Sequence, residues 1–139
     1  MSANPRYGYV KGERNAVSYP VDSGTTAIVV GDLITMGTAG YVQQAAAGDL
    51  IYGVAMEPCA VPTADGAKTC LVDISKHSIY RYPPDAGSVT AALLFKTCDV
   101  GGPQSINIDA TVDDVIYIVG VDVDSNTLLV QISPTPAGV

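Results

Sequence analysis

The chain has 139 residues, a length that suits one domain burying roughly two-thirds of the surface its unfolded chain exposes. Hydrophobic residues make up 47% of the chain and charged residues 15%, which excludes a wholly disordered protein. The formal net charge of −7 disfavours nucleic-acid binding, because phosphate backbones would be repelled. We therefore expect a folded domain without a nucleic-acid partner.

The chain also lacks the sequence signals for membrane insertion and export. Its uninterrupted apolar runs, such as 27–30 and 115–119, cover only a handful of residues, whereas a membrane-spanning helix needs about 20. The first residues lack the apolar segment and small-residue cleavage site of a secretory signal. We expect no membrane partner and synthesis in a cytoplasm.

The N-terminal segment, residues 1–24, has prolines and glycines between three tyrosines and no helical apolar period. Tyrosine combines a large contact area with a polar tip, which suits interfaces. The segment is also relatively basic, whereas residues 97–139 contain six Asp and no Lys or Arg. We predict an extended arm that contacts a partner; a disordered terminus is the alternative. Its candidate contact residues are Arg6, Tyr7, Tyr9, Lys11, Arg14 and Tyr19.

From residue 25 onward, short runs rich in Val, Ile, Thr and Tyr are bounded by Gly, Pro and Asp, a pattern typical of half-buried strands. The predicted strands are 26–30, 33–36, 40–44, 50–56, 69–75, 78–82, 106–108, 115–121 and 128–132. Residues 91–96 are compatible with one or two helical turns. The predicted fold class is therefore all-β: a small barrel or sandwich over residues 25–139, with the extended N-terminal arm and at most one short helix.

Glycine and aspartate mark the expected turns. Gly31-Asp32-Leu33-Ile34 recurs as Gly48-Asp49-Leu50-Ile51, so we expect each Gly-Asp turn to start a strand. Segment 36–41 offers a glycine-bearing hairpin turn. Segment 122–128 predicts a second hairpin tip, since Asp and Asn bond nearby backbone and tolerate left-handed geometry. Gly101-Gly102-Pro103 predicts a further turn.

No arrangement of residues completes a catalytic motif. The single histidine, His77, is expected on a surface turn, and a Ser-His-Asp or Cys-His arrangement with Ser78 or Cys70 has no supporting local motif. The adjacent Asp113 and Asp114 fit the solvated start of a strand better than a pair of hydrolytic acids. We predict that the chain is not an enzyme.

Metal-binding patterns are incomplete as well. Asp122-x-Asp124-x-Asn126 matches the opening of an EF-hand loop, but Thr127 stands where the loop needs glycine and Ser133 where it needs glutamate. A hairpin tip is the expected structure there. No Cys or His pair has chelate spacing, so we expect neither a metal nor another cofactor.

The three cysteines, Cys59, Cys70 and Cys98, form no C-x-x-C pair, and their odd number argues against a disulfide framework. Free cysteine is among the most frequently buried residue types. We expect three buried thiols, with a Cys59–Cys70 disulfide as the alternative.

The run from Thr26 to Met56 resembles the head decoration, or cement, proteins of tailed phages. In that family a strand enters a Gly-Asp turn, and a hydrophobic hairpin, a polar-alanine stretch and a Gly-Val-Ala strand follow. Here Gly31-Asp32, Gly40-Tyr41-Val42 and Gly53-Val54-Ala55 occupy those places. A looser similarity covers residues 65–74.

The resemblance implies a structural virion protein that binds the outer surface of a phage capsid, bridges subunits of the major capsid protein and resists internal DNA pressure. It also implies a homotrimer, an arm lying on the shell and no cofactor. One alternative is another phage virion module, such as a tail-tube or fibre-associated protein. A small-molecule or carbohydrate-binding β-barrel is a further alternative, although the chain has no Trp and one Phe to line a pocket.

Overall fold

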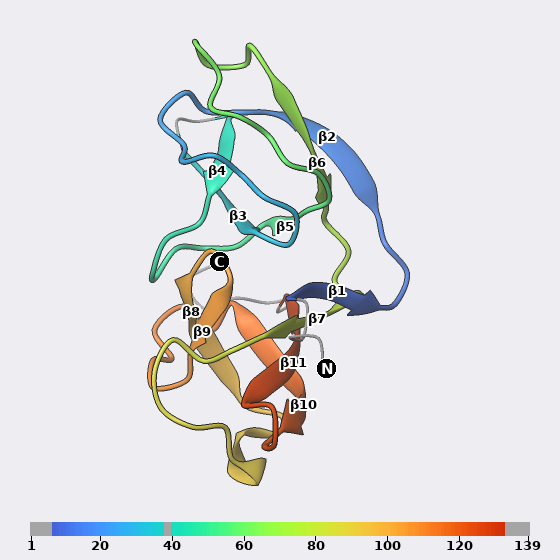
Figure 1. Cartoon of the computed structure of the whole chain (residues 1–139), viewed down its shortest axis with the longest axis vertical. Helices are drawn as coiled ribbons and strands as arrows, with labels where there is room; N and C mark the ends of the chain where they lie inside the picture. The colour runs from blue at the N-terminus through green and yellow to red at the C-terminus, as the bar shows by residue number, and fades with distance from the viewer. Residues whose placement is uncertain (1–6, 38–39, 133–139) are drawn as a thin grey trace, which may run out of the picture.

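The computed structural model describes residues 7–37 and 40–132, whose strands form two antiparallel sheets (Figure 1). The six-stranded sheet has the order β1 (Gly8–Lys11), β7 (Ile79–Tyr82), β11 (Thr127–Ile132), β10 (Ile116–Asp122), β8 (Thr97–Gly102) and β9 (Ser105–Asn107). The five-stranded sheet has the order β2 (Ala16–Pro20), β6 (Thr69–Asp73), β5 (Gly53–Ala55), β3 (Leu33–Met36) and β4 (Val42–Gln44). The only helical segment among these residues is the 3-10 turn η1 (Ala91–Leu93), so the all-β prediction with at most one short helix is confirmed.

The two sheets pack around a shared apolar core. Leu33 and Val54 of the five-stranded sheet meet Tyr80 and Ile118 of the six-stranded sheet there, and all four are fully buried. Successive strand residues point to opposite faces, so Ile34, the neighbour of Leu33, belongs to a second core. The sheets therefore form an open, sandwich-like unit.

The five-stranded sheet curls around this second, smaller core. Its outer strands are β2 and β4, and the chain leaving β2 returns to form a parallel bridge from Val21 to Val42. Asp22 N donates to Val42 O at 2.8 Å beside that bridge. Ile34 and Val72 are buried inside the curl. At this end the sheet approaches a closed barrel.

The N-terminal segment is extended, as expected, but its described part belongs to the body. β1 pairs with β7 and β2 pairs with β6 over five residues, so this segment supplies one outer strand to each sheet (Figure 1). The predicted division between an arm at 1–24 and a domain at 25–139 therefore needs correction. The physical reason is that β6 and β7 would otherwise leave open edges, and the segment satisfies their backbone groups within the same chain.

Most predicted strands are confirmed, but the prediction for residues 26–30 is wrong. That segment makes a single bridge, between Ile28 and Cys59. Asp32 explains the difference, because its Oδ2 accepts a hydrogen bond from Val29 N at 2.9 Å and folds the chain into a turn. The sequence reading also missed β8, which runs through Gly101 and Gly102 before the chain turns.

The repeated Gly-Asp turns share one geometry. Gly31 and Gly48 both have positive φ, at 92° and 80°. Ala46 N donates to Asp49 Oδ2 at 2.8 Å, which reproduces the bond from Val29 N to Asp32. The first turn leads directly into β3, whereas the second is followed by irregular chain before β5 begins at Gly53.

Other local features agree with the predictions made from the sequence. β3 and β4 form one hairpin, and β10 and β11 form a second with residues 123–126 at its tip. His77 is exposed on the turn between β6 and β7. The three cysteines are buried and free, so the Cys59–Cys70 disulfide does not form.

Candidate functional site

A buried carboxylate, Asp73, ties the two sheets together where the chain crosses between them. It ends β6 and has no exposed surface. Its Oδ2 accepts hydrogen bonds from Ser78 Oγ and from Tyr80 Oη of β7, both at 2.7 Å. Its Oδ1 accepts from Asn15 N at 2.9 Å, in the connection between β1 and β2. One side chain thus fixes both chain crossings.

The Asp73 carboxylate is held in its ionised form. Burial alone raises its pKa, but hydrogen bonds from Asn15, Tyr80 and Ser78 outweigh that effect and lower the pKa below its usual value. Arg14 Nε lies 3.3 Å from Oδ2 and supplies a counter-charge. Burial, followed by the bond to Asp73, raises the pKa of Tyr80, so the phenol keeps its proton. This arrangement stabilises the fold and offers no free nucleophile.

Two of the predicted contact residues, Tyr9 and Arg14, lie together next to this cluster. The Arg14 guanidinium carbon lies 4.0 Å from the centroid of the Tyr9 ring, a cation–π contact. Tyr9 Oη donates to Gly12 O at 2.6 Å, and its ring meets Tyr80 edge-on with centroids 6.4 Å apart. Both side chains therefore already have partners within their own chain.

The other predicted contact residues that the structure describes do not form one surface. Tyr7 is 41% exposed, and Lys11 is exposed at the end of β1. Tyr19 lies on β2 in the other sheet and lines a groove described below. Arg6 lies outside the described residues.

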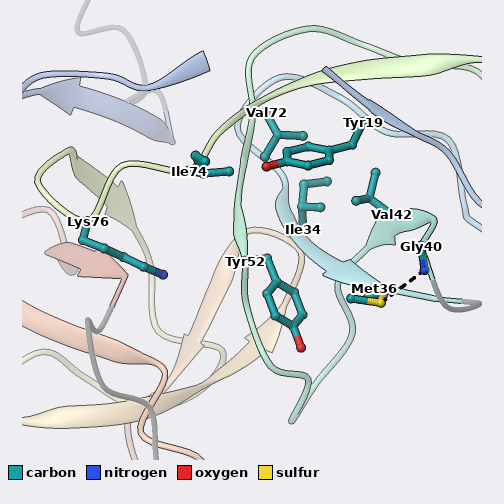
Figure 2. Close-up of a pocket in the computed structure, with 9 residues that line it drawn as sticks. All are labelled: Tyr19, Ile34, Met36, Gly40, Val42, Tyr52, Val72, Ile74 and Lys76. Carbon is teal, nitrogen blue, oxygen red and sulfur yellow. Dashed lines mark hydrogen bonds between the residues drawn. The ribbon is translucent and has the colours of Figure 1, made fainter. Parts of the chain in front are cut away.

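An apolar groove opens where the five-stranded sheet curls (Figure 2). It has a volume of about 470 Å³, and its inner wall comes from β2, β3, β4 and β6. Figure 2 shows the Tyr19 ring next to Val72 and Ile34, with Val42 across from it. Gly53 keeps this wall smooth, since a Cβ there would lie 2.5 Å from Val72 Cγ1.

The rim of the groove is open to solvent, and one cation stands among its described lining residues. Met36 is 45% exposed and Tyr52 is 44% exposed. Lys76 reaches towards the groove from the connection between β6 and β7 (Figure 2). Burial lowers the pKa of its ammonium group, and no described carboxylate forms an ion pair with it. The groove therefore combines an apolar wall with an unpaired positive charge.

The nucleophile arrangements considered from the sequence do not assemble among the described residues. Ser78 Oγ donates directly to Asp73, and the imidazole of His77 is exposed on the turn. Burial raises the pKa of Cys70 and of Cys98 to about 12, which leaves both thiols protonated near neutral pH. No three His, Cys, Asp or Glu side chains within 7–37 and 40–132 gather as a metal-binding group.

The sequence reading missed both Asp73 and the groove. Asp73 did leave a signal, since one carboxylate interrupts the apolar run Cys70–Ile74 and a buried charge needs partners. The groove left none, because Tyr19, Tyr52 and Lys76 are far apart in the sequence and meet only when the sheet curls.

Comparisons with protein-family models, curated proteins and solved structures give no match to this chain. No helix in the described ranges is long and apolar enough to cross a membrane.

Proposed function

We propose that this chain is a structural virion protein that binds the outer surface of a phage capsid and stabilises it by bridging major capsid protein subunits. The observation that carries the proposal is the position of β1. This strand lies at the outer edge of the six-stranded sheet, pairs only with β7 among the described strands, and exposes Tyr9, Val10 and Lys11. An open edge with exposed apolar and basic side chains is suited to contact a neighbouring protein.

The construction of the body supports a mechanical role. Asp73 joins the sheets at one place, and a second buried carboxylate, Asp32, joins them at another. Asp32 is 1% exposed, and its Oδ1 accepts from Gln104 Nε2 at 2.9 Å, while Tyr82 Oη donates to Gly31 O at 2.6 Å. Buried, fully bonded polar contacts of this kind hold two layers in one arrangement. A clamp between capsid subunits requires that rigidity.

The test uses capsids of the virus that encodes the chain, prepared without it. The purified protein should co-sediment with the capsids to a fixed stoichiometry, and its addition should raise the temperature at which they release DNA. A capsid map should place its density on the outer surface between subunits. Density on the tail would favour another virion module, such as a tail-tube or fibre-associated protein, and absence from particles would refute a virion role.

The groove favours a second candidate, a small-molecule-binding barrel. Its volume of about 470 Å³ lies within the usual range for ligand sites, and Tyr19 and Tyr52 supply aromatic rings that the scarcity of Trp and Phe had argued against. Its exposed rim covers a small ligand less completely than such sites usually do. Saturable binding of a fluorescent apolar probe that Tyr19→Ser abolishes would support this candidate.

A further inference from the structure

The connection between β9 and β10 presents an exposed apolar side chain, Val112, and we call residues 112–114 the knob. Val112 is 79% exposed, the highest value among the large hydrophobic side chains described. The buried carboxylate of Asp99 fixes this loop: its Oδ1 accepts from Asp113 N at 2.8 Å and from Asp114 N at 3.0 Å, and its Oδ2 accepts from Val112 N at 3.2 Å. A loop fixed in this way loses little conformational entropy when it binds.

The knob also has a carboxylate with no described partner. Asp114 accepts a hydrogen bond from Thr97 Oγ1 at 3.0 Å, whereas no ion pair or side-chain hydrogen bond to a described residue involves the carboxylate of Asp113. The loop therefore offers an apolar side chain directly followed by a negative charge. The groove has the complementary features: an apolar wall that could contact Val112, and the ammonium group of Lys76, which has no described ion-pair partner and could face Asp113.

We propose that the Val112 loop of one copy of this chain docks into the groove of a second copy, with Val112 against Tyr52 and Met36 and with Asp113 beside Lys76. Val112 does not occupy the groove of its own chain, because its side chain is exposed. The contact is head-to-tail, since knob and groove lie on different parts of the molecule, and such contacts close into rings when their rotation permits. This inference rests on the proposed function and assigns an interface to the homotrimer that the resemblance to decoration proteins implies.

Two other exposed side chains fit the groove less well. Val123 at the β10–β11 tip is also directly followed by an acid, Asp124, but it is 58% exposed, less than Val112, and Asp122 on its other side lies 3.5 Å from Arg81 Nη1. Phe95 is 64% exposed, but its ring stacks on another aromatic ring of the same chain and has no adjacent acid. Val112 therefore has the highest exposure of the three, on a loop whose backbone is fixed by Asp99.

Cysteine cross-linking tests the contact directly. Val112→Cys and Tyr52→Cys are prepared as separate proteins, mixed and oxidised mildly; the mixture should give a disulfide-linked dimer containing one of each. The native cysteines are buried and should contribute little background. Val123→Cys mixed with Tyr52→Cys is the matched control and should give at least about tenfold less dimer, because a disulfide forms only at short Cα separations. Equal yields from both mixtures would overturn the proposal.

Charge reversal supplies an independent readout, the self-association constant from sedimentation velocity. Lys76→Glu and Asp113→Lys should each weaken self-association about tenfold, and the chain carrying both changes should recover to within about threefold of wild type. Asp124→Lys, at the other exposed tip, should change little. Circular dichroism checks that each variant is folded. If a charge-reversal variant does not fold, the cross-linking experiment tests the interface in its place.

Two further results would overturn this interface: a wild-type monomer at every accessible concentration, or self-association insensitive to both charge reversals. Capsid co-sedimentation of the same proteins separates this inference from the proposed function. A wild-type chain that binds capsids but shows neither the cross-link nor the charge dependence refutes only the knob-and-groove contact. A chain that self-associates as described but binds no capsid refutes the proposed function.

Discussion

Tyr80 Oη lies 2.7 Å from Asp73 Oδ2, and both side chains are completely buried. This bond joins β7 of the six-stranded sheet to the end of β6 in the five-stranded sheet. Tyr82, two residues further along β7, is equally buried, but its hydroxyl donates to a neutral carbonyl, Gly31 O, at 2.6 Å. Comparing Tyr80 with Tyr82 therefore separates the contribution of an ionic hydrogen-bond acceptor to stability from that of a neutral one.

Tyr80→Phe should destabilise the protein more than Tyr82→Phe. A hydrogen bond to a charged acceptor contributes about 1.5–3 kcal/mol to the free energy of unfolding, whereas a neutral one contributes about 1 kcal/mol. Both substitutions keep the ring, so packing changes little. Urea unfolding at neutral pH measures the difference, and equal losses would show that the charge on Asp73 adds nothing to the bond.

Acid should remove the advantage of Tyr80. The folded-state pKa of Asp73 is depressed, so its stabilising contribution is present above the unfolded pKa of about 3.9 and is lost as the pH falls through the folded value. The difference in unfolding free energy between wild type and Tyr80→Phe should therefore shrink below about pH 4. The difference for Tyr82→Phe should stay level, because its acceptor does not titrate. A gap for Tyr80→Phe that widens in acid would contradict this assignment.

The sequence predicted strands wherever β-branched residues alternate between turns, and it placed β3 at the observed residues. It failed at 26–30, where the side chain of Asp32 captures Val29 N and prevents strand pairing. It could not place the groove either, because the curl of the sheet follows from the long-range bridge between Val21 and Val42. The failure at 26–30 comes from a hydrogen bond between residues three positions apart, which strand propensity does not record, whereas the curl depends on residues far apart in the chain.

Gly53→Ala should destabilise the fold and disturb the groove together. A Cβ at Gly53 would lie 2.5 Å from Val72 Cγ1 and 2.6 Å from Asp73 O, and overpacking of this kind costs about 1–3 kcal/mol. Gly48→Ala is the control: its φ is +80° but its surroundings are open, so only backbone strain of about 1–2 kcal/mol applies. Thermal unfolding gives the stabilities. Gly53→Ala should also weaken self-association, and Gly48→Ala should not.

Cys70 and Cys98 should resist alkylation in the native protein. Burial raises the pKa of both thiols to about 12, so almost no reactive thiolate exists at mildly alkaline pH. Iodoacetamide followed by peptide mass mapping should find both unmodified in native protein and all three cysteines modified after unfolding in urea. Rapid labelling of Cys98 without unfolding would show that the shared core opens.

Under the proposed function, the residues that would contact a capsid can be ranked only with changes that leave the fold intact. Deletion of residues 1–24 is unsuitable, because it removes β1 and β2 and takes Arg14 and Asn15 away from Asp73. Arg14→Ala is unsuitable too, because it removes the contact between Arg14 Nε and Asp73 Oδ2 that helps to hold the fold. Tyr7 and Lys11 are exposed and make no described hydrogen bond or ion pair through their side chains, so they are the sharper probes.

Tyr7→Ser should weaken capsid binding more than Lys11→Ala. Burying a large apolar side chain contributes about 1.5–3 kcal/mol, whereas an exposed ion pair contributes about 0.2–1 kcal/mol and weakens with salt. Co-sedimentation at low and high salt should show a loss for Tyr7→Ser that persists in salt and a smaller loss for Lys11→Ala that fades. Val61→Ser is the matched control, because Val61 is 44% exposed on the connection between β5 and β6 in the other sheet. A larger loss from Lys11→Ala would mean that charge dominates the contact, and unchanged binding by both variants would remove β1 from it.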